Sequence, residues 1–218
     1  MMNEEISKNM MKSNTSLVSI VCKDGIIMGA DRRVTAGSII MGKKENKIAK
    51  VTDYLLLSFT GGAADALLST KIISAELKLK ELRTKIRPSV KESANLIGMM
   101  LYRSIRTPSM IPHIVGFLVG GVNEDGSTEL YTIEPAGGVY KVSEYDANFS
   151  SGMPYILGLL ERQYRDNLSI KEGVELAKEC LKASTQRDSA SGNGIDVFTI
   201  TSEGIKHVVS EEIIAQYK

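Results

Sequence analysis

Thr15 is the first residue of this sequence whose surroundings suggest chemistry. It separates residues 1–14, a polar and methionine-rich segment without hydrophobic periodicity, from an apolar run typical of a strand. A cut between Asn14 and Thr15 would create an N-terminal threonine, whose hydroxyl could attack a carbonyl carbon while its own α-amine accepts the proton. An α-amine has an unperturbed pKa of about 7.7–8, so modest tuning would suffice near neutral pH. Such an arrangement could hydrolyse amides, although without supporting residues elsewhere the simpler interpretation is that residues 1–14 are a disordered tail that stays on.

Two charged residues further along the chain could support such a nucleophile. An adjacent lysine cation such as Lys47 would lower the pKa values of the amine and the hydroxyl, and the Asp31 carboxylate could orient that lysine. Each residue alone also has a simpler interpretation. Lys47 could be a solvated lysine at a strand edge, and Asp188 beside Arg187 could be a weak surface ion pair. The chemistry therefore depends on the whole set.

The ordered set of motifs resembles the catalytic β subunits of the proteasome, which are N-terminal-nucleophile hydrolases. The motifs are Asn14-Thr15, Gly29-Ala30-Asp31-Arg32-Arg33, Lys43-Lys44-Glu45-Asn46-Lys47, Phe59-Thr60-Gly61-Gly62 and Arg187-Asp188-Ser189-Ala190-Ser191-Gly192. The resemblance covers almost all of the chain from Thr15 onward. It implies that Thr15 is the nucleophile, that Asp31 and Lys47 pair beside it, and that the backbone N–H of Gly61 forms the oxyanion hole.

By the same resemblance, three further residues hold the amine and its water: Ser151, Asp188 and Ser191. Two positions depart from the family pattern. Asn14 stands where a glycine usually precedes the nucleophile, and Met153 stands where a second serine is common. Asparagine enters left-handed backbone conformations more readily than most residues, so we expect self-cleavage at Asn14-Thr15, at a reduced rate.

The resemblance also assigns a pocket for the side chain that precedes the scissile bond. Its residues are Val34, Glu45, Ala49, Phe59, Ala63 and Leu67. Most of these side chains are apolar, and Phe59 would form the floor and take up volume. We therefore expect a preference for mid-sized apolar side chains, with Glu45 at the rim admitting some basic ones.

The order of elements predicts how these residues are positioned. Strands, two helices, strands, two helices and closing strands follow one another without a linker, which favours a single domain over 15–218 behind a leader, 1–14, that is removed on maturation. The fold class is α+β, a four-layer α-β-β-α sandwich of two mainly antiparallel sheets, as the resemblance also implies. The helix over 63–86 is predicted to turn one apolar stripe toward the sheet. The stripe comprises Ala64, Leu68, Ile72, Ala75, Leu79, Leu82 and Ile86.

Composition excludes several other classes of protein. A net charge of +1 gives no field to attract nucleic acid or an anionic membrane, and no window approaches the roughly 20 apolar residues of a membrane span. The N-terminus lacks a secretory signal. Cys22 and Cys180 lie far apart in apolar settings, so free thiols in a reducing cytoplasm are expected. The histidines and cysteines have no metal-ligand spacing, so neither a metal nor another cofactor is expected.

The resemblance implies partners as well. They are β rings, homo- or hetero-heptameric, stacked with rings of α subunits, an unfoldase ATPase cap, and polypeptide substrates.

Four alternatives remain open. One is a non-catalytic β subunit that keeps its leader, which Asn14 favours. The others are a small-amide hydrolase of the same nucleophile class, the shorter bacterial-type peptidase, and a serine hydrolase built from Ser191, His207 and Asp188 without a Gly-x-Ser-x-Gly elbow.

Overall fold

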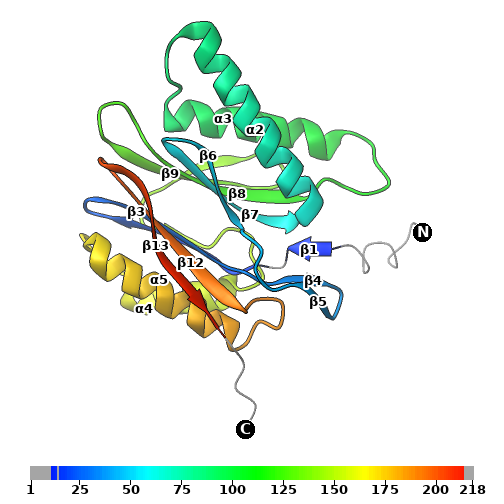
Figure 1. The fold of residues 1–218 in the computed structure, drawn as a ribbon, viewed down its shortest axis with the longest axis vertical. Helices are drawn as coiled ribbons and strands as arrows, with labels where there is room; N and C mark the ends of the chain where they lie inside the picture. Colours follow the sequence, from blue (N-terminus) through cyan, green and yellow to red (C-terminus); the bar gives the residue numbers. More distant parts are fainter. Residues whose placement is uncertain (1–10, 14, 214–218) are drawn as a thin grey trace.

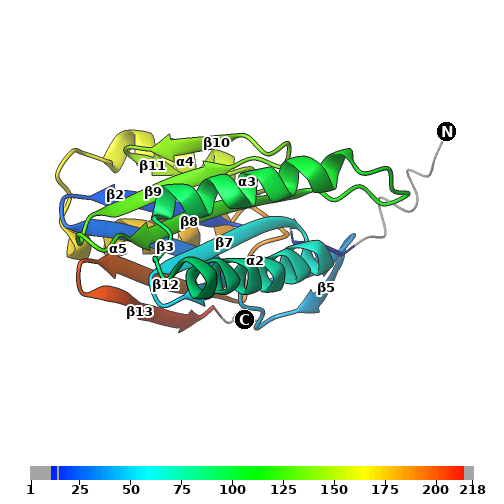
Figure 2. The same cartoon turned by 90° about the horizontal axis from the view of Figure 1, so that it is seen from above.

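Two antiparallel sheets lie face to face, and each carries a pair of helices on its outer side (Figure 1). The computed structural model describes residues 11–13 and 15–213. Helices α2 (Ala63–Thr84) and α3 (Val90–Arg106) cover the larger sheet, and α4 (Met153–Gln163) and α5 (Ile170–Thr185) cover the smaller one (Figures 1 and 2). This arrangement confirms the predicted α+β sandwich of four layers.

The larger sheet has the strand order β10-β9-β8-β7-β1-β4-β5, with β6 paired to β7. Its strands are β1 (Met11–Ser13), β4 (Val34–Ala36), β5 (Ile39–Gly42), β6 (Ile48–Thr52), β7 (Leu55–Gly62), β8 (Val115–Val122), β9 (Thr128–Ile133) and β10 (Val139–Val142). The N-terminal strand β1 therefore lies inside the sheet, between β7 and β4. Neither of these neighbours follows β1 directly in the sequence, so the sheet brings distant segments together at this point.

The smaller sheet has the order β11-β2-β3-β12-β13. Its strands are β11 (Tyr145–Asp146), β2 (Leu17–Cys22), β3 (Gly25–Asp31), β12 (Gly194–Thr201) and β13 (Gly204–Glu212). Strands β2 and β3 are buried on both faces because one face meets the larger sheet and the other meets α4 and α5. Leu17 belongs to the core between the sheets, while its neighbour Val18 belongs to the core beneath the helices.

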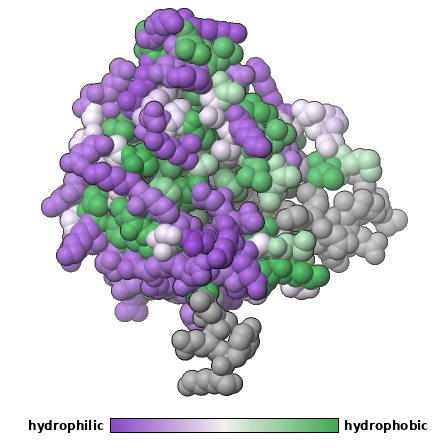
Figure 3. Space-filling model, in the orientation of Figure 1, coloured by the Kyte–Doolittle hydropathy of each residue, from purple (hydrophilic) through white to green (hydrophobic). Residues whose placement is uncertain are grey.

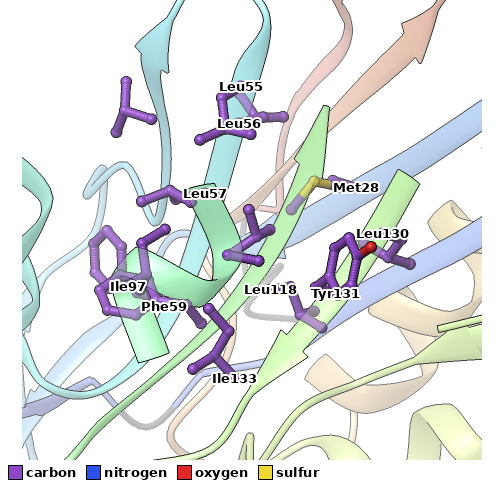
Figure 4. Close-up of a cluster of buried hydrophobic side chains, with 14 of the residues drawn as sticks. Met28, Leu55, Leu56, Leu57, Phe59, Ile97, Leu118, Leu130, Tyr131 and Ile133 are labelled. Carbon is purple, nitrogen blue, oxygen red and sulfur yellow. The ribbon is translucent and has the colours of Figure 1, made fainter. Parts of the chain in front are cut away.

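The core between the two sheets joins side chains from both of them. Met28 of β3 lies in the same cluster as Leu118 of β8 and Tyr131 of β9 (Figure 4). The sheets approach closely at Gly120, where a Cβ atom would collide with Met28 and Ile200 of the facing sheet. This packing sets the spacing between the layers that carry the candidate site.

Two helices begin at capping boxes that the sequence itself predicts, Ser89-Val90-Lys91-Glu92 and Ser169-Ile170-Lys171-Glu172. Ser89 accepts a hydrogen bond from the backbone N–H of Glu92, and the Glu92 carboxylate accepts one in return, which forms a capping box at the start of α3. Ser169 and Glu172 do the same at the start of α5. Caps of this kind contribute about 1 kcal/mol each, because they satisfy backbone donors that have no partner within the helix.

The predicted orientation of the apolar stripe on α2 is wrong. The helix buries a different line of residues, Ala66, Ser69, Ile73 and Leu77. The predicted stripe points to solvent, and we call five of its members the α2 seam: Leu68, Ile72, Ala75, Leu79 and Leu82. Figure 3 shows hydrophobic residues at the surface in the upper part of the molecule, where α2 and α3 lie. This helix has two rows of largely apolar side chains, and the sheet covers the row with fewer of them.

None of the helices among the described residues is long and apolar enough to cross a membrane.

Candidate active site

Thr15 lies two residues before β2 and is completely buried. Its backbone carbonyl accepts hydrogen bonds from the hydroxyl of Ser151 and from the backbone N–H of Gly152, both at 3.2 Å. The backbone N–H of the next residue, Ser16, donates to Asp31 Oδ1 at 2.9 Å. The backbone at Thr15 is thus held from two sides, by the loop before α4 and by the end of β3.

Asp31 accepts hydrogen bonds from four residues of the candidate site. Its Oδ1 oxygen accepts from Lys47 Nζ at 2.8 Å as well as from Ser16, and its Oδ2 oxygen accepts from the backbone N–H groups of Arg33 and Gly192 at 2.9 and 2.8 Å. The residue is 1% exposed. The four donors satisfy both oxygens of this buried carboxyl group, which therefore fixes the segments that supply them.

Lys47 lies directly before β6 and is 2% exposed. Burial lowers the pKa of its ammonium group, while the charge and hydrogen bond of Asp31 oppose that shift. Because Lys47 Nζ and the N–H of Ser16 share one oxygen of Asp31, the lysine head lies beside the peptide that joins Thr15 to Ser16. The sequence-predicted residues Thr15, Asp31 and Lys47 therefore come together at one point.

A second cluster lies on the other side of Thr15. Asp188 Oδ2 accepts hydrogen bonds from the hydroxyls of Ser151 and Ser191, both at 2.6 Å, and its Oδ1 accepts from the N–H of Ala190. Ser151 links this cluster to the carbonyl of Thr15. The structure brings Ser151, Asp188 and Ser191 together beside Thr15, and their catalytic roles stay predictions.

Arg33 clamps the loop that carries Asp188 and Ser191. Its Nε donates to Asn193 Oδ1 at 2.8 Å, and its Nη1 donates to the carbonyl of Ser189 at 2.7 Å. Gly192 has a φ of +147°, and a Cβ atom there would collide with the Arg33 guanidinium. This role of Arg33 was not predicted, although the residue lies only two positions after Asp31 in the same motif.

Gly61 lies near the end of β7, opposite Ser13 of β1 on one side and Val115 of β8 on the other. Its φ of +111° is in the region that favours glycine, and a Cβ atom would collide with the carbonyl of Ile114. The backbone at this position therefore requires glycine. Its role as oxyanion donor stays a prediction.

Strand β1 pairs with strands on both sides. Met11 and Lys12 lie opposite Ala36 and Thr35 of β4, while Lys12 and Ser13 lie opposite Gly62 and Gly61 of β7. The segment that directly precedes the predicted cleavage point thus runs as an extended strand through the site. Asn14 itself lies outside the described residues.

A cavity of about 170 Å³ opens beside Lys47. Its lining consists of Val34, Met41, Gly42, Glu45, Asn46, Lys47, Phe59, Ala63 and Leu67. Five of the six residues predicted for the specificity pocket line it, and Ala49 does not. Met41, Gly42 and Asn46 were missed. Met41 and Gly42 lie on β5, which only the fold brings to this cavity, whereas Asn46 lies between Glu45 and Lys47, which were both named from the sequence.

The alternative site built on His207 does not form. His207 Nε2 lies 2.9 Å from Asp196, and the ring stacks on Phe198, while Asp188 and Ser191 bond to each other. Among the described residues, no group of three or more histidine, cysteine or acidic side chains could hold a metal ion.

Comparison with known proteins shows what this chain resembles. Residues 11–200 match the family described as proteasome subunit. The proteasome subunit beta of Ferroglobus placidus is 36% identical over 201 residues, which covers 92% of this chain and 93% of the relative. That of Archaeoglobus profundus is 36% identical over 96% of this chain and 94% of its own, and the proteasome subunit beta 2 of Pyrococcus abyssi is 35% identical over 92% and 93%. On these matches, the chain belongs to the proteasome subunit family.

Proposed function

We propose that this chain is a catalytic β subunit of a proteasome core, a threonine-type endopeptidase whose nucleophile is Thr15. The observation that carries the proposal is the buried pair of Lys47 and Asp31, joined through Ser16 to the peptide beside Thr15. Removing two such charges from water is costly. A subunit that only built a ring would have no need of this pair together with the cluster around Asp188.

In the proposed reaction, the free α-amine of Thr15 takes the proton of the Thr15 hydroxyl as the oxygen attacks the substrate carbonyl carbon. The Gly61 N–H stabilises the oxyanion that forms. The intermediate collapses, the C–N bond breaks, and the leaving amine takes the proton from the α-ammonium. Water then attacks the resulting ester on Thr15, with the α-amine again as base, and releases the second product. The Lys47 cation lowers the pKa of the amine, and Asp31 keeps the lysine in place.

The strand β1 supports an extended polypeptide as the substrate. Once residues 1–14 are removed, the position between β4 and β7 becomes available to another chain segment with the same antiparallel pairing. Backbone pairing of this kind gives affinity with little dependence on sequence. An unfolded segment has unpaired backbone N–H and C=O groups on both sides and can therefore pair with β4 and β7 at once.

The cavity beside Lys47 supports a preference for mid-sized apolar residues before the scissile bond. Val34, Phe59 and Leu67 supply apolar walls, and Glu45 is exposed at the edge. Phe59 takes up volume at the wall of this cavity of about 170 Å³, which favours a mid-sized side chain over a larger one. Glu45 adds a carboxylate that attracts basic residues.

Maturation uses the same Thr15 hydroxyl, while the Thr15 nitrogen is still in the peptide bond to Asn14. The hydroxyl attacks the Asn14 carbonyl carbon, the C–N bond breaks as the Thr15 nitrogen takes up the proton, and water hydrolyses the ester that results. The products are the leader, 1–14, and a domain over 15–218 that begins with the free amine.

The α2 seam supports assembly with neighbouring subunits. Its members alternate at intervals of four and three residues, the spacing by which one helix packs along another. We propose that a helix of an adjacent subunit covers it. The family implies the larger particle, in which heptameric β rings stack with α rings, an unfoldase ATPase feeds substrates, and the whole works in the cytoplasm.

The test is to co-express the chain with an α subunit, isolate particles by size, and measure intact mass and cleavage of a fluorogenic peptide. Active particles should contain a β chain that starts at Thr15. Thr15→Ala particles should assemble, keep residues 1–14 and lack activity, while Thr15→Ser should retain part of it. Full-length β chains in active particles, or activity in Thr15→Ala particles, would refute the proposal. Assembled but inactive wild-type particles would favour the purely structural subunit.

A further inference from the structure

We propose that Ser184, in the last turn of α5, is a positioning residue for the Thr15 site. Its hydroxyl ends a buried chain of hydrogen bonds that runs through Ser16 and Ser191 to the carboxylate of Asp188. The inference rests on the proposed function, because it takes Thr15 as the nucleophile that this carboxylate serves.

The chain is continuous and dry. Ser184 Oγ lies 2.5 Å from Ser16 Oγ, and Ser16 Oγ lies 2.8 Å from Ser191 Oγ. Ser191 Oγ lies 2.6 Å from Asp188 Oδ2. Each of the three serines is fully buried, so water does not compete for these hydroxyls. Each hydrogen bond therefore has one available geometry.

The carboxylate decides the direction of every bond in the chain. An ionised carboxylate only accepts, so Ser191 must donate to Asp188. A hydroxyl has a single proton, so Ser191 must accept from Ser16, and Ser16 must in turn accept from Ser184. Ser184 is thus the donor that fixes the hydroxyl rotor of Ser16, and through it the rotor of Ser191.

Ser184 also holds Asp188 through its backbone. Its carbonyl accepts hydrogen bonds from the N–H groups of Arg187 and Asp188, at 3.0 and 2.8 Å. The backbone bond places the residue, and the hydroxyl chain orients its carboxylate. Ser184 therefore holds both the backbone and the side chain of Asp188.

Gly152 seals the chain on the side of Thr15. Its N–H donates to the carbonyl of Thr15, and a Cβ atom at this position would collide with the hydroxyls of both Ser16 and Ser184. The backbone that holds Thr15 is thus in direct contact with the two serines. A change at Ser184 reaches Thr15 by this contact as well as through Asp188.

Loss of the Ser184 hydroxyl should slow the chemical step without weakening substrate binding. Ser16 would lose its donor, and both serine rotors and the Asp188 carboxylate would lose their single orientation. None of these residues lines the cavity beside Lys47, so the substrate contacts stay unchanged. The expected result is a lower kcat at constant KM.

The experiment compares variants within assembled, mature particles. Ser184→Ala should lower kcat by about tenfold, the scale of losing one buried hydrogen bond, with KM within about twofold of wild type. Ser16→Ala should have a similar effect. The double variant should have a kcat close to that of the less active single variant, because both changes break the same chain of hydrogen bonds. Ser184→Cys keeps a side chain of similar size but offers a weaker hydrogen-bond donor. Its kcat should therefore lie between the values for wild type and Ser184→Ala.

Ser93→Ala is the matched control. Ser93 is also a fully buried helical serine, but its hydroxyl donates to the carbonyl of Ser89 in α3, far along the chain from the site. The kcat of Ser93→Ala particles should equal that of wild-type particles. If Ser184→Ala does not assemble, Ser184→Cys and Ser16→Ala decide the matter.

Three results would overturn the inference: an unchanged kcat in the Ser184 and Ser16 variants, an equal loss in Ser93→Ala, or fully additive losses in the double variant. Failure of the proposed function is distinct, because it would show as inactive wild-type particles or as active Thr15→Ala particles.

Discussion

Lys47 Nζ lies 2.8 Å from Asp31 Oδ1, and the two side chains are only 1% and 0% exposed. The pair lies beside the peptide that follows Thr15, where it contributes both to stability and to the electrostatics of the nucleophile. Measurements of peptidase activity and of unfolding free energy on the same variants report these two contributions separately.

Lys47→Ala should abolish peptidase activity and self-cleavage, because no cation then lowers the pKa of the Thr15 hydroxyl or, in the mature chain, of the Thr15 amine. It should also cost about 3–5 kcal/mol of stability, since Asp31 stays buried without its counter-ion. Lys47→Arg should also be inactive, because a planar guanidinium cannot replace a compact ammonium there. Lys50→Ala, which removes an exposed lysine from the surface pair with Asp53, is the control and should change neither quantity. Normal turnover in either Lys47 variant would show that the lysine has no catalytic part.

The pairing of β1 with β4 and β7 predicts that the backbone of the leader affects the rate of self-cleavage. Lys12→Pro removes a backbone N–H in a strand that pairs on both sides, so the scissile carbonyl should be misplaced. Misplacement by about 1 Å can cost about a hundredfold in rate, so maturation should slow strongly. Lys12→Ala keeps the N–H and should mature normally. Intact mass over a time course of assembly measures both variants, and equal rates would contradict the pairing as a determinant of cleavage.

The α2 seam predicts a surface that matters only in the particle. Ile72→Glu places a charge in the seam, and because Ile72 is 42% exposed, the fold itself should lose little stability. Assembly with α subunits should fail or weaken, as seen by native mass or size-exclusion chromatography. Lys71→Glu introduces the same residue at the neighbouring exposed position outside the seam and should assemble normally. Full assembly of Ile72→Glu would show that no helix covers the seam.

The cysteines predict a dependence on pH. Burial raises the pKa of Cys22 and of Cys180 from 9.0 to about 12. Folded thiols should therefore resist iodoacetamide at pH 9, while the urea-unfolded chain reacts fully. The raised pKa values also stabilise the fold, fully below pH 9 and progressively less as the pH rises toward 12, because only the unfolded thiols ionise in that window. Rapid alkylation of the native particle at pH 9 would contradict the burial of these thiols.

The sequence alone predicted much of this architecture. The α+β sandwich followed from the order of elements together with the family resemblance, and the starts of α3 and α5 followed from the capping boxes at Ser89 and Ser169. These features are local or depend only on element order, so composition and spacing contain them. The motifs around Thr15, Asp31 and Lys47 also named residues that the fold brings together, because a resemblance includes the spatial relations of the family.

Other features were decided only by the tertiary structure. Periodicity shows that a helix has an apolar line but not what covers it, so α2 was predicted with the wrong side toward the sheet. The hydrogen bond between Ser16 and Ser184 joins residues 168 positions apart, and no local pattern encodes such a contact. The pairing of β1 with β4 and β7, and the place of Met41 in the cavity, likewise depend on how the sheet closes around the chain. Local sequence determines which elements form, whereas the burial of distant surfaces against one another determines which of their side chains meet.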